Sequence, residues 1–127
     1  ISMLDMSVFV YDYDFNADSA RQLRDTHSRF FNIIREKHKK LPVIMMSRPK
    51  ANYNEEEKQR REVIFNTYKR AKDSGDENVY FLDGEAFFGS DDDKYLCSTD
   101  GTHPNDLGFY RMSQLIEPIL KKILEKI

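Results

Sequence analysis

Val43-Ile44-Met45-Met46 is a run of four apolar residues that lies between Pro42 and a polar loop beginning at Ser47. A short apolar run bounded by loop-forming residues is typical of a strand that is buried on both faces. Two further runs have the same character and predict strands from about Met6 to Asp12 and over Val79–Leu82. The chain is therefore expected to contain three short, buried strands.

Helical patterns separate these strands. Apolar residues recur at helical spacing over 20–40, and Pro42 stops that helix. Asn54 precedes three glutamates, which is a helix start with an N-cap and acids in the first turn, and this helix is predicted to continue to about Lys72. A last helix is predicted to start near Asp106 and to carry a long apolar stripe.

The alternation of strands and helices predicts an α/β fold, a three-layer αβα arrangement with a parallel sheet. No internal repeat or linker is visible, so residues 1–127 are expected to form one domain. Three strands make a very small parallel sheet, and buried strands need neighbours, so the sheet is expected to be incomplete. In such sheets reactive groups gather in the loops at the carboxyl ends of the strands.

The composition argues against several classes of protein. The 127 residues include 20 Lys and Arg against 22 Asp and Glu, and this net charge of −2 argues against a general binder of nucleic acid or anionic membranes. The single cysteine, Cys97, cannot form an internal disulfide, and no apolar run approaches the roughly 20 residues of a membrane helix. No signal segment is visible, so the cytoplasm is the default expectation, and the lack of an initial Met indicates that the chain begins within a larger protein.

Asp100 and His103 are the most informative candidates for chemistry. They lie three residues apart in a polar stretch that follows the third strand and precedes the last helix. A turn at Gly101 would let the carboxylate reach one imidazole nitrogen and leave the other free as a general base. Such a pair is two-thirds of a nucleophilic triad. The alternative is a capped loop that enters a helix, with His103 solvated.

The stretch Asp100-Gly101-Thr102-His103-Pro104, continued by residues 105–109, resembles the Asp-x-x-His-Pro block of the SGNH (GDSL-type) hydrolases. Its extension through Tyr110-Arg111-Met112 is similar to a bacterial GDSL-like acylhydrolase subgroup. The resemblance covers almost the whole chain, but only the carboxyl-terminal portion of the family's domain. It implies that the three strands correspond to strands three to five of a five-stranded sheet.

The segment after the first strand stands where the family has a Gly-x-Asn-Asp block. Asn16 aligns with the oxyanion-hole asparagine of that block, whose amide stabilises charge that appears in the transition state. Asp14 stands where many members have Gly, and Ala17 stands where they have Asp. The family's nucleophilic serine, in a turn after the first strand of its sheet, and its second-block glycine have no counterpart among these residues.

The resemblance implies a serine esterase or acylhydrolase that acts on small acyl esters, such as acetylated carbohydrate. His103 would accept the proton of the serine, Asp100 would orient the imidazole, and Asn16 would help to bind the oxyanion. No metal or cofactor is required. Because the nucleophile is absent, this chain alone is expected to be inactive.

Two other functions compete with this interpretation. Asp12 and Asp14 after an apolar strand imitate the start of a haloacid-dehalogenase-type phosphatase, in which Asp12 would attack phosphate and Asp14 would be the general acid. Mg²⁺ would bridge the carboxylates and the phosphate. Ser47 and the acids of residues 91–93 could imitate later motifs of that family. The plainer alternative for Asp12 and Asp14 is a strand end with solvated acids. The second competitor is a non-catalytic remnant that survives as a folding or interaction module.

The remaining polar residues predict ordinary structural roles. His27 is expected on the surface or at the edge of the core, and Arg48 is expected in a solvated loop. The mixed charges of residues 55–62, which include Arg60, predict an ion-paired helix face. A first strand without its neighbour would expose Val10 and unpaired backbone groups, so association into a homodimer through that edge is also expected.

Overall fold

The computed structural model describes residues 1–126, and its sheet has the predicted parallel topology. Strands β1 (Phe9–Tyr11), β2 (Val43–Met46) and β3 (Val79–Leu82) are ordered β1-β2-β3, and both pairs are parallel. Strand β2 is buried over its whole length, because it has a neighbour on each edge and helices on each face. The expectation of an α/β fold is confirmed.

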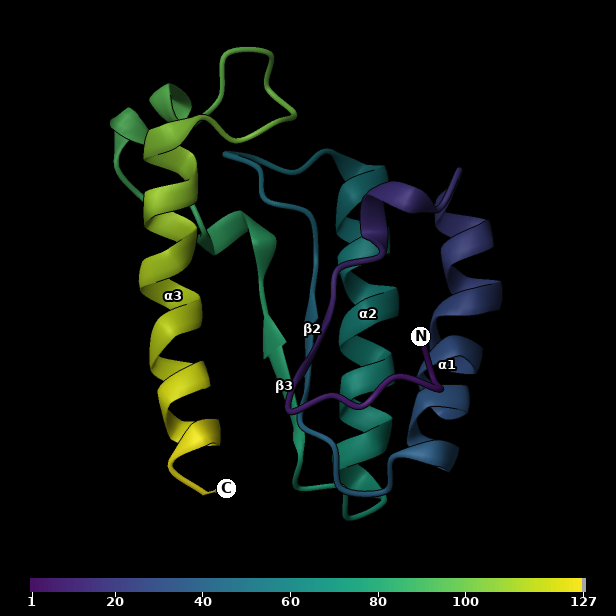
Figure 1. The fold of residues 1–127 in the computed structure, drawn as a ribbon. Coiled ribbons are helices and arrows are strands. Elements are labelled where there is room, and N and C mark those ends of the chain that lie inside the picture. Colours follow the sequence, from purple (N-terminus) through teal and green to yellow (C-terminus); the bar gives the residue numbers. More distant parts are fainter. Residues whose placement is uncertain (127) are drawn as a thin grey trace.

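The three main helices form the outer layers of an αβα arrangement. Helices α1 (Ala20–Lys37) and α2 (Glu55–Asp73) pack against each other on one face of the sheet, and α3 (Asp106–Leu124) lies on the other face (Figure 1). Local side chains start each helix: Ser19, Asn54 and Asn105 accept a backbone N–H of the first turn. At Asn54 the helix start is a full capping box, since the Glu57 carboxylate in turn accepts the Asn54 backbone N–H.

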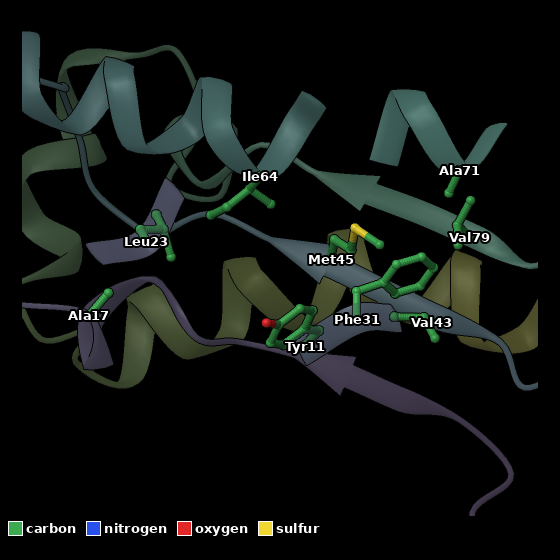
Figure 2. Packing of buried hydrophobic residues seen from close by; sticks show 9 residues of the cluster. All are labelled: Tyr11, Ala17, Leu23, Phe31, Val43, Met45, Ile64, Ala71 and Val79. Carbon is green, nitrogen blue, oxygen red and sulfur yellow. The ribbon is translucent and has the colours of Figure 1, made fainter. Parts of the chain in front are cut away.

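The main core lies between the sheet and the pair α1–α2. Figure 2 shows Tyr11, Met45 and Val79 of the three strands facing Phe31 of α1 and Ile64 of α2. A second cluster on the α3 side contains Met46, Phe87, Phe88 and Cys97, with Met112 and Ile116 of α3 packed against it. The apolar stripe predicted for α3 is only partly buried, because Leu115 and Leu124 are exposed.

Two elements are shorter than predicted. Strand β1 covers Phe9–Tyr11 instead of the whole of residues 6–12. Within the described part of the chain it pairs only with β2, and the last residue pair is Tyr11 with Met45. Helix α1 ends at Lys37 instead of Lys40. Beyond it, the Arg35 guanidinium donates to the carbonyls of His38 and Leu41 at 2.8 and 2.7 Å, which fixes the chain in a turn before β2.

Parallel strands place all of their following loops at one edge of the sheet, here called the carboxyl rim. The turn η1 (Asp14–Asn16) follows β1, the loop of residues 47–54 follows β2, and η2 (Gly84–Ala86) and η3 (Asp92–Cys97) follow β3. Figure 1 shows these segments gathered at the same end of the molecule. Among residues 1–126, none of the helices combines the length and apolar character needed to cross a membrane.

Candidate active site

Asp100 and His103 are held together in the loop between η3 and α3. Gly101 adopts a φ of +77°, in the left-handed region that favours glycine, and this turn brings the two side chains to the same side. Nδ1 of His103 lies 2.6 Å from Oδ2 of Asp100. The other oxygen, Oδ1, accepts the backbone N–H groups of Thr102 and His103, both at 2.8 Å. Ser98 and Pro104 close the base of the loop in an isolated antiparallel bridge.

The electrostatics of this pair fix the imidazole tautomer. The hydrogen bond from the His103 side chain, followed by those from the His103 and Thr102 backbone, holds the pKa of Asp100 well below its ordinary value. An ionised carboxylate only accepts hydrogen bonds, so Nδ1 of His103 is the donor, and the free acceptor of the neutral imidazole is Nε2. The His103 side chain is 82% exposed, and Nε2 is therefore accessible to a reacting group at the rim.

Asn16 lies at the same rim, at the end of η1 and exposed to solvent. Its backbone N–H donates to Tyr13 at 2.9 Å. Within the described part of the chain its side-chain amide makes no hydrogen bond to Asp100, His103 or any other residue, so the structure brings Asp100 and His103 together and leaves Asn16 as a separate, open donor at the rim.

Asp14 is completely buried, which corrects the interpretation of it as a solvated acid. Oδ1 of Asp14 is 3.0 Å from an Arg48 guanidinium nitrogen and 3.3 Å from one of Arg60, and Oδ2 accepts the Arg48 backbone N–H at 2.9 Å. Arg48 is therefore part of a buried ion cluster. The expectation of a solvated loop was wrong. A buried carboxylate needs such partners, because removing an unpaired carboxylate from water costs roughly several kcal/mol.

The loop of residues 47–54 links the turn that carries Asn16 to the segment that leads to His103. At one end Arg48 binds Asp14, and at the other Asn52 accepts a hydrogen bond from Lys94 of η3 at 2.8 Å and donates to the Tyr95 hydroxyl. Asn105 then ties η3 to α3, since its side chain donates to the Leu96 carbonyl at 2.6 Å. A continuous set of polar contacts thus joins the parts of the rim.

Buried groups hold the base of this loop in place. Oγ of Ser47 accepts the Gly84 N–H at 2.8 Å and contacts the Tyr53 hydroxyl at 2.9 Å, so it is fully occupied and inaccessible as a nucleophile. Gly84 itself has no room for a side chain, because a Cβ there would lie 1.9 Å from the Arg48 carbonyl oxygen. Cys97 is buried beside the His103 loop, as a packed side chain.

The same observations weigh against the phosphatase interpretation. In that scheme Asp14 must donate a proton to a substrate, but its carboxylate is buried and occupied by Arg48 and Arg60. Ser47, the counterpart of a second motif, is buried as well. The acids Asp91 and Asp92 are exposed, and Asp93 pairs with Arg111 at 2.6 Å, away from Asp14 in the chain.

His27 and Arg60 have roles that the sequence did not reveal. His27 is fully buried under Tyr11, with ring centroids 4.3 Å apart, which corrects its expected place at the surface or core edge. Arg60 was expected on an ion-paired helix face, and it does pair with Glu56, but it is buried and also contacts Asp14. The only hint in the sequence was that Arg60 lies on the same face of the helix as buried Ile64 and Thr67.

Comparisons with known proteins find similarity along almost the whole chain. The profile of the GDSL-like lipase/acylhydrolase family matches residues 1–121. A crystal structure from Bacteroides ovatus ATCC 8483, assigned as a GDSL-like lipase, is 31% identical over 98% of this chain, with a TM-score of 0.78. The salicylyl-acyltransferase SsfX3 of a tetracycline biosynthetic pathway is 20% identical over 89% of this chain, with a TM-score of 0.68, and this likeness shows the fold alone. The chain spans 38% and 36% of those two proteins. A search of curated proteins found no match.

Proposed function

Since the chain belongs to the GDSL-like lipase/acylhydrolase family, we propose that Asp100 and His103 form the acid–base part of an ester-hydrolysing active site. The observation that carries this proposal is the 2.6 Å contact between Nδ1 of His103 and Oδ2 of Asp100, at the rim where an αβα sheet presents its reactive loops. The parent activity is that of a serine esterase or acylhydrolase.

In the proposed reaction each residue has a defined task. A serine hydroxyl attacks the ester carbonyl carbon and its proton passes to Nε2 of His103, while Asp100 stabilises the imidazolium that forms. Asn16 donates its amide to the oxyanion of the tetrahedral intermediate. The alcohol leaves with the proton from Nε2. A water molecule, activated by the same nitrogen, then attacks the acyl-enzyme and releases the acid.

The serine of this reaction is proposed to come from outside the 127 residues. Ser47 is buried and occupied, and Ser98 contacts Asp100 rather than the imidazole, with Oγ 3.2 Å from Oδ1. Among the residues that the structure describes, no serine hydroxyl is hydrogen bonded to His103. The chain by itself is accordingly proposed to be inactive, as the carboxyl-terminal part of an SGNH-type domain.

The proposed substrates are small acyl esters of a bulky polar alcohol, such as acetylated carbohydrate. In the described chain the Asp100 and His103 side chains are 56% and 82% exposed. The part of the domain that would carry the serine would also border this pair, so the proposed substrate class rests on the family alone.

Labelling with a fluorophosphonate, which reacts with activated serines, tests this proposal. The complete gene product, expressed with whatever residues its gene encodes ahead of Ile1, should be labelled on one serine outside the 127 residues. Labelling and p-nitrophenyl acetate hydrolysis should both be lost in His103→Ala. The 127-residue chain should remain unlabelled; hydrolysis by that chain above the buffer rate, abolished by His103→Ala, would contradict its proposed inactivity.

The same assays separate the competing functions. A complete gene product that shows neither labelling nor ester hydrolysis would favour the non-catalytic remnant. Mg²⁺-dependent hydrolysis of p-nitrophenyl phosphate that is lost in Asp12→Asn would favour the phosphatase instead.

We also propose that the free edge of β1 associates with a second copy of the chain. Among residues 1–126, strand β1 pairs only with β2, and Val10 is 41% exposed. A cleft of about 540 Å³ runs beside this edge, lined by β1 and by Phe30 and Ile33 of α1, which are 43% and 51% exposed. An unpaired strand beside apolar surface favours edge-to-edge pairing. Light scattering at high micromolar concentration should give a dimer mass, and a monomer mass would refute this.

A further inference from the structure

The turn that carries Asn16 has two backbone hydrogen bonds of its own, and the first, from the Asn16 N–H to the Tyr13 carbonyl, is 2.9 Å long. It is a single 3-10 turn, Asp14–Asn16, and its closing hydrogen bond from the Ala17 N–H to the Asp14 carbonyl is long, at 3.4 Å. Short 3-10 segments have unfavourable hydrogen-bond geometry. The carboxyl-terminal half of the turn, which follows Asn16, therefore depends on contacts from outside the turn.

Arg60 of α2 supplies these contacts from below the turn. One guanidinium nitrogen donates to the Asp14 carbonyl at 2.9 Å, and both terminal nitrogens donate to the Ala17 carbonyl at 3.1 Å. These two carbonyls lie on either side of Asn16 in the chain, so one planar group holds both ends of the turn. The Arg60 side chain is only 5% exposed, which removes competition from water.

The Asp14 carboxylate completes the arrangement. It neutralises Arg60, with a contact of 3.3 Å. It also accepts hydrogen bonds from the backbone N–H and the guanidinium of Arg48, in the loop after β2. The family's glycine has no side chain to do this, whereas Asp14 ties the turn to two other elements of the rim. Glu57 extends the cluster, 3.8 Å from Arg48, so the buried charges are balanced.

From this geometry we propose that Arg60 is a positioning residue: its guanidinium, anchored by Asp14, fixes the turn that aims Asn16 at the oxyanion. The inference rests on the proposed function, in which Asn16 is the oxyanion donor. Lysine should not replace Arg60, because a single ammonium group cannot hold two carbonyls in the fixed fork of a guanidinium.

The first test needs only the 127-residue chain. In ¹⁵N relaxation measurements the Asn16 backbone amide should have an order parameter near 0.85 in the unchanged chain and below about 0.6 in Arg60→Met. Arg61→Met is the matched control, since Arg61 lies on the same helix but pairs with Asp83 and Glu85, and it should leave Asn16 rigid. Should Arg60→Met fail to fold, Arg60→Lys, which keeps the charge, decides the question. An Asn16 that stays rigid in the folded Arg60 variant overturns the inference.

The second test is a double-mutant cycle on the ester hydrolysis of the complete gene product. Asn16→Ala should lower kcat about 100-fold or more with little change in KM, as expected for loss of an oxyanion donor. Arg60→Lys should lower kcat at least about 10-fold in the Asn16 background and less than about 2-fold when Asn16 is already Ala, because coupled groups are not additive. An equal loss in both backgrounds overturns the positioning role alone, whereas full activity in Asn16→Ala overturns the oxyanion role and the inference built on it.

Discussion

Oδ2 of Asp100 lies 2.6 Å from Nδ1 of His103, while Oδ1 of the same carboxylate accepts two backbone N–H groups of the loop. The backbone thus fixes the position of the carboxylate independently of its contact with the imidazole. A group held in this way can set both the orientation and the tautomer of His103, and the loop needs no residue from elsewhere in the chain to form the pair.

Replacing Asp100 should therefore damage catalysis without unfolding the protein. Asp100→Asn places an amide where an ionised acceptor stands and no longer selects the Nδ1–H tautomer. The kcat of ester hydrolysis by the complete gene product is expected to fall about 10²- to 10⁴-fold. Asp92→Asn is the control, an exposed acid in η3 that should leave kcat unchanged. Equal rates for the two variants would remove Asp100 from the mechanism.

Protonation of His27 should couple stability to pH. Burial, as the largest cause, lowers the pKa of His27 to about 4, and Nε2 has no hydrogen-bond partner among the described residues. The folded chain therefore stays neutral at this position while the unfolded chain binds a proton below its ordinary pKa of about 6.5. The free energy of unfolding should fall by up to about 3 kcal/mol as the pH drops from 6.5 to 4, and His27 should contribute nothing further above 6.5.

Urea denaturation across this pH range measures the effect. His27→Phe removes the titrating group and should flatten the curve between pH 6.5 and 4. His38→Gln, which changes a partly exposed histidine bonded to the Ser2 carbonyl, should keep the slope of the original chain. A slope that persists unchanged in His27→Phe would assign the acid sensitivity to other groups.

Replacing Gly84 by alanine should cost more stability than replacing Gly75, where only the backbone conformation favours glycine. A Cβ at Gly84 would meet the Arg48 carbonyl oxygen at 1.9 Å, so Gly84→Ala must displace the loop after β2 and should cost about 3 kcal/mol. Gly75→Ala has open space but a φ of +90°, and should cost about 1–2 kcal/mol. Equilibrium urea unfolding of both variants checks the order; a Gly84→Ala variant as stable as Gly75→Ala would show that the loop adapts.

Asn105 should matter for both stability and the His103 loop. Its side chain caps α3 through the Gly108 N–H at 3.0 Å and holds the Leu96 carbonyl. Asn105→Ala and the matched cap variant Ser19→Ala should each cost about 1 kcal/mol in urea unfolding. Only Asn105→Ala should also broaden or shift the NMR signals of residues 98–104. Identical spectra for that loop in both variants would count against the second role.

Much of the fold could be predicted because its signals are local. The run Val43–Met46 was apolar enough to predict β2 with its observed bounds, and Asn54 with Glu57 marked the start of α2. The pairing of Asp100 with His103 was also expected, since the two lie three residues apart with a glycine between them. Such features depend on neighbours in the chain, which the sequence displays directly.

The corrected expectations for polar side chains all concern residues whose partners are distant in the chain. Arg60 reaches Asp14 across 46 positions, and Nδ1 of His27 lies 3.0 Å from Oγ1 of Thr67, 40 positions away. An arginine or a histidine at helical spacing looks the same whether its side chain enters water or the core. Its environment is set only when helices close over the sheet, and burial then makes an opposite charge or a hydrogen bond obligatory.

The amino-acid order by itself determined the strands, the helix starts and the loop that unites Asp100 with His103, because short-range sterics and capping act within a few residues. Tertiary packing alone decided that Asp14 would be buried between two arginines and that the turn of Asn16 would rest on α2. The physical reason is desolvation: a charge becomes a structural anchor only where the folded chain excludes water and brings its counter-charge within reach.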